Sequence, residues 1–294
     1  MRYIPLLPAA LALLLTSACS QAQSDEKTQK PIGGDRHKNE TAAAAIPGLR
    51  RVGSLKGVVP ESSGLAPGDT PGTYYSFGDD GNTPTLYKIN GQGEATGVPL
   101  AVGTTNTDWE SLSRDPQGNY YIGDCGNNEN QRRDLVIHKM RPGRPEQVQD
   151  IQFSYPDQRE FPPKKKQRNF DCEASLWHDG RVWLFTKDRA LASTSKVYSV
   201  PDQPGTYDAK LVTRLAIAGE VTDAALRADG RRLVLLGRGE LFILDGNSWA
   251  EILKATPRKV SLDGAGQTEG AVFKDDATLL ISTEQGALYE FTLP

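Results

Sequence analysis

Two stretches of the chain share one pattern: ESSGLAPGDTPGTYYSFGDDGNTPTLYKI (residues 61–89) and DWESLSRDPQGNYYIGDCGNNENQRRDLVIHKM (residues 108–140). Each opens with an acidic residue and a short apolar segment, passes through a turn rich in Asp and Gly, and ends in a third apolar strand-like segment. Weaker copies begin at Asp171, Val221 and Thr268. Repetition at this length predicts an array of similar supersecondary units.

The spacing of the copies indicates the kind of unit. Successive acidic positions lie 49, 63, 50 and 46 residues apart, a period that fits a four-stranded blade. The segments between the turns are short and rich in β-branched and aromatic residues. We therefore predict an all-β fold, a β-propeller with five blades. Six blades are the alternative, because the 63-residue interval is long. The equivalent acidic residues are Glu61, Glu110, Glu173, Asp223 and Glu269.

The ends of the repeat region predict how the ring closes. The last copy reaches Pro294 after three strands, whereas residues 50–55, before the first copy, form a strand-like segment without a blade of its own. We expect this N-terminal strand to complete the final blade, which would leave no exposed sheet edge at the junction. Very little helix is expected.

The N-terminal residues predict export. Arg2 precedes an apolar run at residues 6–15, and small residues lead to Cys19. This pattern is typical of a signal peptide (residues 1–18) followed by a lipidated Cys19, and it resembles the lipobox of bacterial lipoproteins. An ordinary signal peptide with a free Cys19 is the alternative. Residues 19–45 are expected to carry the lipid and a flexible stalk, and residues 46–294 the propeller. We expect an outer-membrane anchor facing the periplasm.

The net charge indicates which partners are disfavoured, and the cysteine content predicts whether the mature protein has a disulfide. The formal net charge of −3 argues against bulk attraction to nucleic acid. Cys125 and Cys172 are the cysteines left after Cys19, and an exported protein with two such residues predicts a disulfide between them. Two buried free thiols are the alternative.

One face of the predicted ring gathers the candidate site residues. The start of each innermost strand and the end of each second strand meet there, at the mouth of the central channel. The five equivalent acidic residues are the predicted metal ligands, and oxygen-only ligands favour Ca²⁺. The predicted ligand-binding residues are Asp79, Asp80, Trp109, Asp124, Lys187 and Glu284.

The residues of this mouth also allow other interpretations. The carboxylates could instead cap backbone N–H groups of adjacent blades as a repeated structural device. No histidine is expected at the mouth, which disfavours a Ser-His-Asp hydrolase, but pairs of carboxylates could serve as acid and base. Lys164, Lys165, Lys166 and nearby arginines form a basic fringe on the same face, and a solvated charged loop is the simpler explanation of it.

The succession ESSGLA, FGDDGN, DWE and GDCGNN resembles a widespread group of secreted bacterial β-propeller proteins without an assigned reaction. The resemblance spans residues 61–140 most strongly and implies fold and export. The chain is also distantly similar to calcium-dependent lactonase and gluconolactonase propellers, in which a Glu opening an inner strand binds the metal. By position, that likeness implies a metal-binding role for Glu61, Glu110, Glu173, Asp223 and Glu269.

Three functions follow as hypotheses. The favoured one is a non-enzymatic binding module, with the carboxylate mouth holding a cation or a small molecule and the disk surface available to a protein partner. The second is a metal-assisted hydrolase of lactones, esters or glycosides. The third is a scaffold subunit of an outer-membrane assembly. Fold class alone does not distinguish them.

Overall fold

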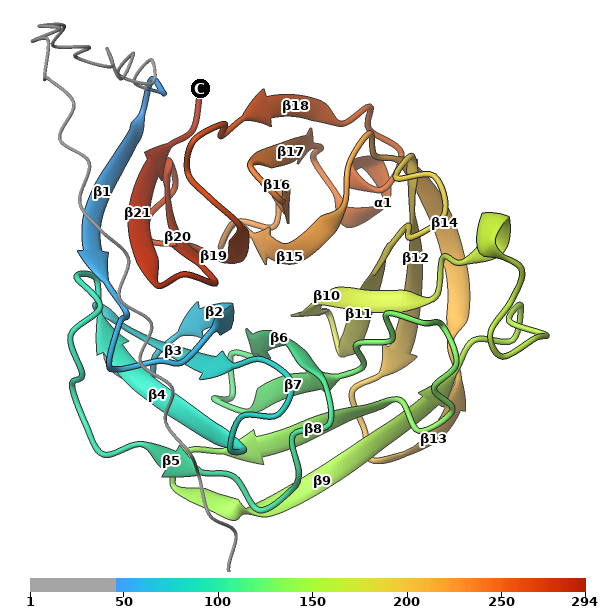
Figure 1. Cartoon of the computed structure of the whole chain (residues 1–294), viewed down its shortest axis with the longest axis horizontal. Coiled ribbons are helices and arrows are strands. Elements are labelled where there is room, and N and C mark those ends of the chain that lie inside the picture. Colours follow the sequence, from blue (N-terminus) through green and yellow to red (C-terminus); the bar gives the residue numbers. More distant parts are fainter. Residues whose placement is uncertain (1–45) are drawn as a thin grey trace, which may run out of the picture. The chain divides into compact units, whose positions relative to one another are not determined.

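The computed structural model describes residues 46–294, in which 21 strands form five sheets around a central axis, with every pairing antiparallel except that of β13 with β9 (Figure 1). Cys19 and the predicted signal peptide and stalk lie outside the described residues. The predicted five-bladed propeller is therefore confirmed, and six blades are excluded. As expected, helix is scarce: η1 (Lys165–Gln167) and α1 (Trp249–Ile252) are single turns. No helix in the described part of the chain has the length and apolarity needed to span a membrane.

Blades 1 to 4 each have their first strand nearest the axis, and in blade 5 this position belongs to the first strand of the last repeat (Figure 1). Blade 1 contains β2 (Ser62–Pro67), β3 (Thr73–Gly78), β4 (Thr85–Asn90) and β5 (Leu100–Ala101). Blade 2 contains β6 (Trp109–Arg114), β7 (Tyr120–Asp124), β8 (Val136–Arg141) and β9 (Arg144–Ser154). Blade 3 contains β10 (Asp171–His178), β11 (Arg181–Lys187), β12 (Thr194–Pro201) and β14 (Lys210–Ala216).

Blades 4 and 5 complete the ring. Blade 4 contains β15 (Val221–Leu226), β16 (Arg232–Gly237), β17 (Glu240–Asp245) and β18 (Arg258–Ser261). Blade 5 contains β19 (Thr268–Phe273), β20 (Thr278–Thr283), β21 (Ala287–Thr292) and the N-terminal β1 (Leu49–Ser54). The pairing of β1 with β21 is the predicted closure. In addition, β13 (Gly205–Asp208) leaves blade 3 and pairs in parallel with β9, which fastens blade 2 to blade 3.

Local turn chemistry sets the strand lengths. In the Asp115–Gly118 turn, the Asp115 carboxylate accepts a hydrogen bond from the backbone N–H of Asn119 at 2.8 Å. Gly118 has φ of 82°, a conformation that costs glycine little and other residues more. The turn therefore ends β6 and starts β7 in register, so that Trp109 lies opposite Asp124 at the other end of the hairpin.

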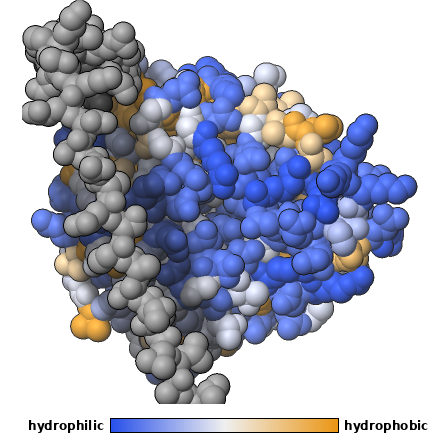
Figure 2. Space-filling model, in the orientation of Figure 1, coloured by the Kyte–Doolittle hydropathy of each residue, from blue (hydrophilic) through white to orange (hydrophobic). Residues whose placement is uncertain are grey.

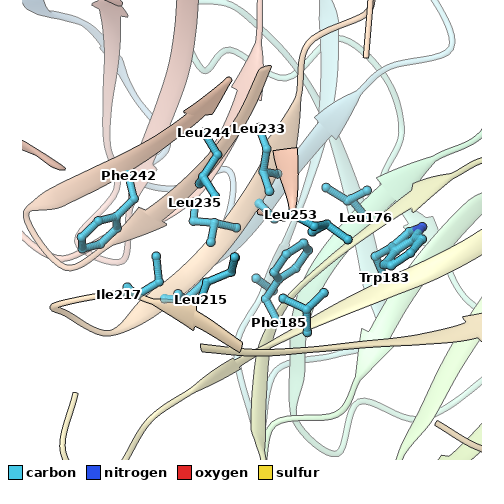
Figure 3. Packing of buried hydrophobic residues seen from close by; sticks show 14 of the residues in the cluster. Leu176, Trp183, Phe185, Leu215, Ile217, Leu233, Leu235, Phe242, Leu244 and Leu253 are labelled. Carbon is cyan, nitrogen blue, oxygen red and sulfur yellow. The ribbon is translucent and has the colours of Figure 1, made fainter. Parts of the chain in front are cut away.

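Apolar side chains fill the spaces between neighbouring blades. The cluster between blades 3 and 4 shows the pattern, because residues from both sheets interdigitate there (Figure 3). Such packing removes large apolar areas from water and makes each blade depend on its neighbours. The labelled members are Leu176, Trp183, Phe185, Leu215, Ile217, Leu233, Leu235, Phe242, Leu244 and Leu253.

The two cysteines are neighbours, but the predicted disulfide is not formed. Cys125 and Cys172 are both buried free thiols in the cluster between blades 2 and 3. The Cys125 thiol donates to the carbonyl oxygen of Cys172 at 3.3 Å, and the Cys172 thiol donates to the carbonyl oxygen of Ala174 at 3.6 Å. Burial raises the pKa of the Cys125 thiol well above its usual value. Each sulfur is therefore satisfied as a neutral donor.

Candidate functional site

A cavity of about 280 Å³ opens where the innermost strands begin, and we call it the mouth cavity. Strand starts and second-strand ends from different blades contribute to it, as the predicted geometry requires. Every lining residue is polar or charged. They are Glu61, Ser63, Asp79, Asp80, Asp108, Glu110, Asn128, Glu173, Lys187, Arg189, Arg238, Gln267 and Glu269.

A β-bulge at the start of every innermost strand positions this lining. The register of β6 shifts between Trp109 and Ser111, and corresponding shifts occur in β2, β10, β15 and β19. A bulge re-aims the extra residue out of the regular alternation. Glu110 and its equivalents Glu173 and Glu269 occupy this position and line the cavity. In blades 1 and 4 the bulge position holds Ser63 and Thr222.

The bulges place two of the predicted metal ligands differently from the other three. Glu61 precedes its strand by one residue, so its structural equivalent is Asp108 and not Glu110. Asp223 follows the bulge of β15 and is not among the residues that line the cavity. Its carboxylate accepts the backbone N–H groups of Ala271 at 2.7 Å and Ala224 at 2.8 Å. Asp223 thus has the capping arrangement that was the alternative for the whole set.

The half of the cavity formed by blades 3 to 5 carries its own counter-charges. Glu173 accepts from the ammonium of Lys187 at 2.9 Å and from the guanidinium of Arg189 at 2.6 Å. Burial opposes ionisation of Glu173, but these two cations hold its pKa below the usual value. Arg238 lies 3.7 Å from Glu269 and 3.9 Å from Glu220. This half is therefore balanced within the protein.

The half formed by blades 1 and 2 lacks such partners. Asp79, Asp108 and Glu110 each place a carboxylate oxygen within 4.8 Å of the others. Within residues 46–294, no basic side chain forms an ion pair with any of the three. Their hydrogen bonds are few: Ser63 donates to Glu110 at 3.2 Å, and the backbone N–H of Asp80 donates to Asp79 at 2.7 Å. We call these three residues the carboxylate triad.

Burial and mutual repulsion raise the pKa values of the three carboxyl groups of the triad. Burial raises the pKa of Asp108 to about 7, and the charges of Asp79 and Glu173 add to the effect. Burial also raises the pKa of Glu110 well above its usual value, and the pKa of Asp79 rises for the same reason. Ionised carboxylates at this spacing are unfavourable unless a proton or a cation compensates them. The triad can therefore hold protons or a metal ion.

Backbone features leave room for the triad. A Cβ atom at Gly126 would overlap the carboxylate of Asp108, so a larger residue there would displace the Asp108 side chain from its present position. Glu61 stands at the rim, where its carboxylate accepts from the side-chain amide of Asn82 at 3.0 Å. The backbone of Glu61 has φ of 44°, an uncommon conformation for a residue other than glycine, and such residues are enriched at functional sites.

The predicted ligand-binding residues divide into two groups. Asp79, Asp80 and Lys187 line the cavity, whereas Trp109, Asp124 and Glu284 do not. Trp109 is fully buried, packs edge-to-face on Phe77, and donates its indole N–H to the carbonyl of Thr105 at 2.9 Å. Trp109 therefore belongs to the core between blades 1 and 2. Glu284 lies outside the lining, and its backbone N–H donates to the carbonyl of Gln267.

Asp124 acts on the triad through the backbone. Its carboxylate accepts the N–H groups of Thr107 and Asp108, both at 3.1 Å, and pairs with Arg132 at 2.9 Å. His138 lies behind it, 3.6 Å from the second carboxylate oxygen. These contacts hold the segment that leads into Asp108, which makes Asp124 a positioning residue.

Replacing Asp124 by Asn should therefore weaken cation binding by about 10–100-fold, the usual effect of losing an outer-shell partner. The reason is that the amide offers only one acceptor oxygen for the N–H groups of residues 107 and 108. Calcium titration of the variant, with Asp263→Asn as a matched surface control outside the lining, measures this. Equal affinity in Asp124→Asn and wild type would contradict the positioning role.

Sequence reasoning did not nominate several lining residues, of which Asp108 and Arg189 matter most. The signal for Asp108 is an alignment of ESSGL with DWESL on Leu65 and Leu112, which pairs Glu61 with Asp108 and Ser63 with Glu110. No comparable signal exists for Arg189. It follows Asp188 in the turn after β11, and its guanidinium reaches back to Asp171 at 2.5 Å.

Comparison with known proteins supports the fold. No protein-family model and no curated protein matches the chain. Among solved structures, a gluconolactonase from Xanthomonas campestris is 12% identical, with 84% of this chain and 89% of that chain covered and a TM-score of 0.50. A PQQ-bound aldose sugar dehydrogenase from Streptomyces coelicolor is 10% identical (84% and 99% covered, TM-score 0.46). A virginiamycin B lyase from Staphylococcus aureus is 11% identical (79% and 66% covered, TM-score 0.42). The likeness to the gluconolactonase shows that this chain shares its propeller fold.

Proposed function

We propose that this protein is a binding propeller of the cell envelope that holds a Ca²⁺ ion on the carboxylate triad and takes a small polar ligand in the mouth cavity. One observation carries the proposal: Asp79, Asp108 and Glu110 converge within 4.8 Å without a basic partner, while the other buried carboxylates of the mouth have one. An uncompensated cluster of this kind is stabilised by a cation that the protein itself does not supply.

The donor set favours Ca²⁺ over transition metals. The lining side chains offer carboxylate, amide and hydroxyl oxygens as possible metal ligands, and no His or Cys is among them. Hard cations prefer carboxylate oxygen, and Ca²⁺ takes six to eight such ligands in flexible geometry, about twice the number of residues in the triad. Water, rim carboxylates such as Glu61 and Asp80, or a bound ligand would supply the rest. The wholly polar lining favours a hydrophilic ligand over an apolar one.

The envelope location is supported by the sequence alone. Cys19, preceded by Ser17 and Ala18 and an apolar run, has the composition of a lipidation site. We propose that the lipid anchors the protein to the outer membrane with the propeller in the periplasm. Metabolic labelling with a palmitate analogue tests this, because labelling should disappear in Cys19→Ser.

A metal-assisted hydrolase is the second candidate, and one observation favours it. Burial raises the pKa of Glu269 to about 7, and this residue shares the mouth cavity with the triad. A carboxyl group that titrates near neutrality can act as a general acid or base beside a metal-activated water. A screen of lactones, esters and glycosides in the presence of Ca²⁺ distinguishes the candidates. Turnover lost in Glu269→Gln, with Ca²⁺ binding unchanged, would establish the hydrolase.

The raised pKa values predict how stability depends on pH. Asp108 and Glu269 titrate near 7 when folded and near 4 when unfolded, so the folded state binds more protons between these values. Without Ca²⁺, the free energy of unfolding should therefore fall as pH rises from about 4 to 7. The stabilisation by Ca²⁺ should grow over the same range, since protons compete with the ion. Melts in EDTA and in Ca²⁺ from pH 5 to 8 measure both, and a rising midpoint in EDTA would contradict the assignment.

Thermal melts with different ions test the proposed function directly. At a free Ca²⁺ concentration 100 times the dissociation constant, binding stabilises the folded state by about 2.7 kcal/mol, which corresponds to about 5–10 °C in midpoint. We expect this rise with Ca²⁺, a smaller one with Mg²⁺, and none in Asp108→Asn. Asp263→Asn, a surface carboxylate outside the cavity, is the matched control. Equal midpoints in EDTA and Ca²⁺ would refute the cation site.

A further inference from the structure

A second cavity, a groove of about 550 Å³, lies at blade 3 beside the segment that leads into β10. One wall is the loop at residues 155–169, which projects beside β14 in Figure 1, and the other is the loop at residues 188–193 between β11 and β12. Neither the triad nor any other residue of the mouth cavity lines this groove. It is therefore a separate feature of the surface.

The groove is preformed by buried hydrogen bonds. The side-chain amide of Asn169 donates to the carbonyl of Thr194 at 2.9 Å, and its oxygen accepts from the hydroxyl of Thr186. Gln158 donates to the carbonyl of Asn130 at 2.7 Å. These contacts tie the long loop to blades 2 and 3, so a ligand would meet walls that already have their shape.

The acidic residues of the groove are mostly engaged in hydrogen bonds or ion pairs, whereas three of its four basic residues are not. Asp157 accepts from Lys196 at 2.9 Å and from the hydroxyl of Tyr198 at 2.8 Å. Asp188 accepts the backbone N–H groups that follow it at residues 190, 191 and 193. Glu160 is the remaining acid. By contrast, three exposed basic residues form no ion pair and no side-chain hydrogen bond within residues 46–294: Arg159, Lys166 and Arg214.

The positive charge at this groove is opposite in sign to the net charge of the whole chain. The formal net charge is −3, yet Lys164 and Lys165 extend the uncompensated basic group beyond the groove. The corresponding side of the face in Figure 2 is largely hydrophilic. Pro163, Phe170, Ala190 and Leu191 are the apolar residues of the lining, and Leu191 is the large one among them that is exposed, at 68%. Clustered basic charge with one apolar contact favours an anionic partner that also carries an apolar group.

We propose that this groove docks an acidic peptide segment, with carboxylates facing Arg159, Lys166 and Arg214 and an apolar side chain against Leu191. Arg159 and Lys166 lie seven residues apart in the long loop, and Arg214 lies on β14. Such a distribution matches several anionic groups along one extended ligand better than a single phosphate. The inference is independent of the cation site, since it uses none of its residues.

The test is fluorescence anisotropy with two labelled peptides of twelve residues. The first contains Asp, Glu, Gly and two Leu residues, and the second has Lys at every acidic position. The variants are Arg159→Glu/Lys166→Glu/Arg214→Glu and, as a control with the same change in net charge, Arg51→Glu/Arg144→Glu/Lys210→Glu. The control residues are exposed and form no ion pair in the described chain. Leu191→Ser removes the apolar contact.

We expect the acidic peptide to bind at least about tenfold more tightly than the basic one, and the groove variant to lose at least about tenfold in affinity. The control variant should lose less than about threefold, and Leu191→Ser should weaken binding without altering its dependence on salt. Equal binding of both peptides, or equal losses in groove and control variants, would overturn the proposal. Binding of phosphatidylglycerol vesicles but not of the acidic peptide would overturn it in favour of a lipid surface.

Discussion

Replacing Glu173 by Leu is expected to lower the free energy of unfolding by about 3–5 kcal/mol, because the substitution leaves a buried charge without its partner. Lys187 is fully buried, and its ammonium lies 2.9 Å from Glu173. The next carboxylate, that of Glu220, is 3.9 Å away and partly exposed. Denaturant unfolding of the variant measures the loss.

A double variant shows how much of the loss in stability comes from the broken ion pair and how much from altered packing. In Glu173→Leu/Lys187→Met both charges are replaced by apolar groups of similar size, so most of the stability should return. Glu220→Gln should cost less than about 1 kcal/mol, since its contact with Lys187 is longer and reaches solvent. If Glu173→Leu alone cost less than about 1 kcal/mol, the ion pair would not be the element that balances this half of the mouth.

Replacing Asp108 by Asn is expected to weaken Ca²⁺ binding by about 100-fold or more. Asp108 supplies one of the triad's three converging carboxylates. Calcium sites depend on the number and charge of their ligands, and the loss of even an outer-shell partner commonly costs 10–100-fold. Competition against a fluorescent calcium chelator measures the change.

The same variant should not be less stable than the wild type in EDTA. The substitution removes one of three crowded carboxylates, so the buried site no longer contains the charge that burial and repulsion disfavour, which are the causes of the raised pKa of Asp108. Stability in EDTA should therefore stay equal or increase while affinity falls. A variant that kept wild-type affinity would show that the ion, if bound, uses other residues. A large loss of stability in EDTA would show that Asp108 serves the fold.

The repeat made the fold predictable from sequence. Hairpin turns such as Asp115–Gly118 and strands such as Tyr120–Asp124 follow local chemistry that is visible in the residues themselves. Ring closure by β1 was predictable because the last copy lacks one strand. The parallel strand β13 was not predictable, since Gly205–Asp208 has a short polar sequence and pairs with a strand about 50 residues earlier.

The site was predictable only to within one or two residues. Aligning the copies on their acidic residues ignores the bulge at each strand start, and the bulge decides which side chain faces the cavity. This is why Asp223 caps N–H groups and Asp108 joins the triad. The pairing of charges in the mouth was also not predictable, because Lys187 reaches Glu173 from the paired strand β11 and Arg189 reaches it from the loop that follows.

The prediction of a disulfide was wrong for a different reason. Adjacent blades do bring Cys125 and Cys172 into one cluster, as the repeat implied. Their sulfurs nevertheless find carbonyl acceptors on the bulged segment of β10, which the sequence pattern does not reveal. Proximity of two cysteines is thus predictable from a repeat, whereas the direction of each thiol depends on local backbone geometry.

Isothermal titration calorimetry of the purified protein with Ca²⁺ at pH 7.5, after dialysis against EDTA and then chelator-free buffer, tests whether the carboxylate triad binds Ca²⁺. We expect one saturable binding event per chain, accompanied by proton release, because Asp108 and Glu110 must be ionised to hold the ion. Repeating the titration in buffers with different ionisation enthalpies detects the released protons. No saturable heat at millimolar Ca²⁺, or binding that persists unchanged in Asp108→Asn, would contradict the assignment of the mouth as a cation site.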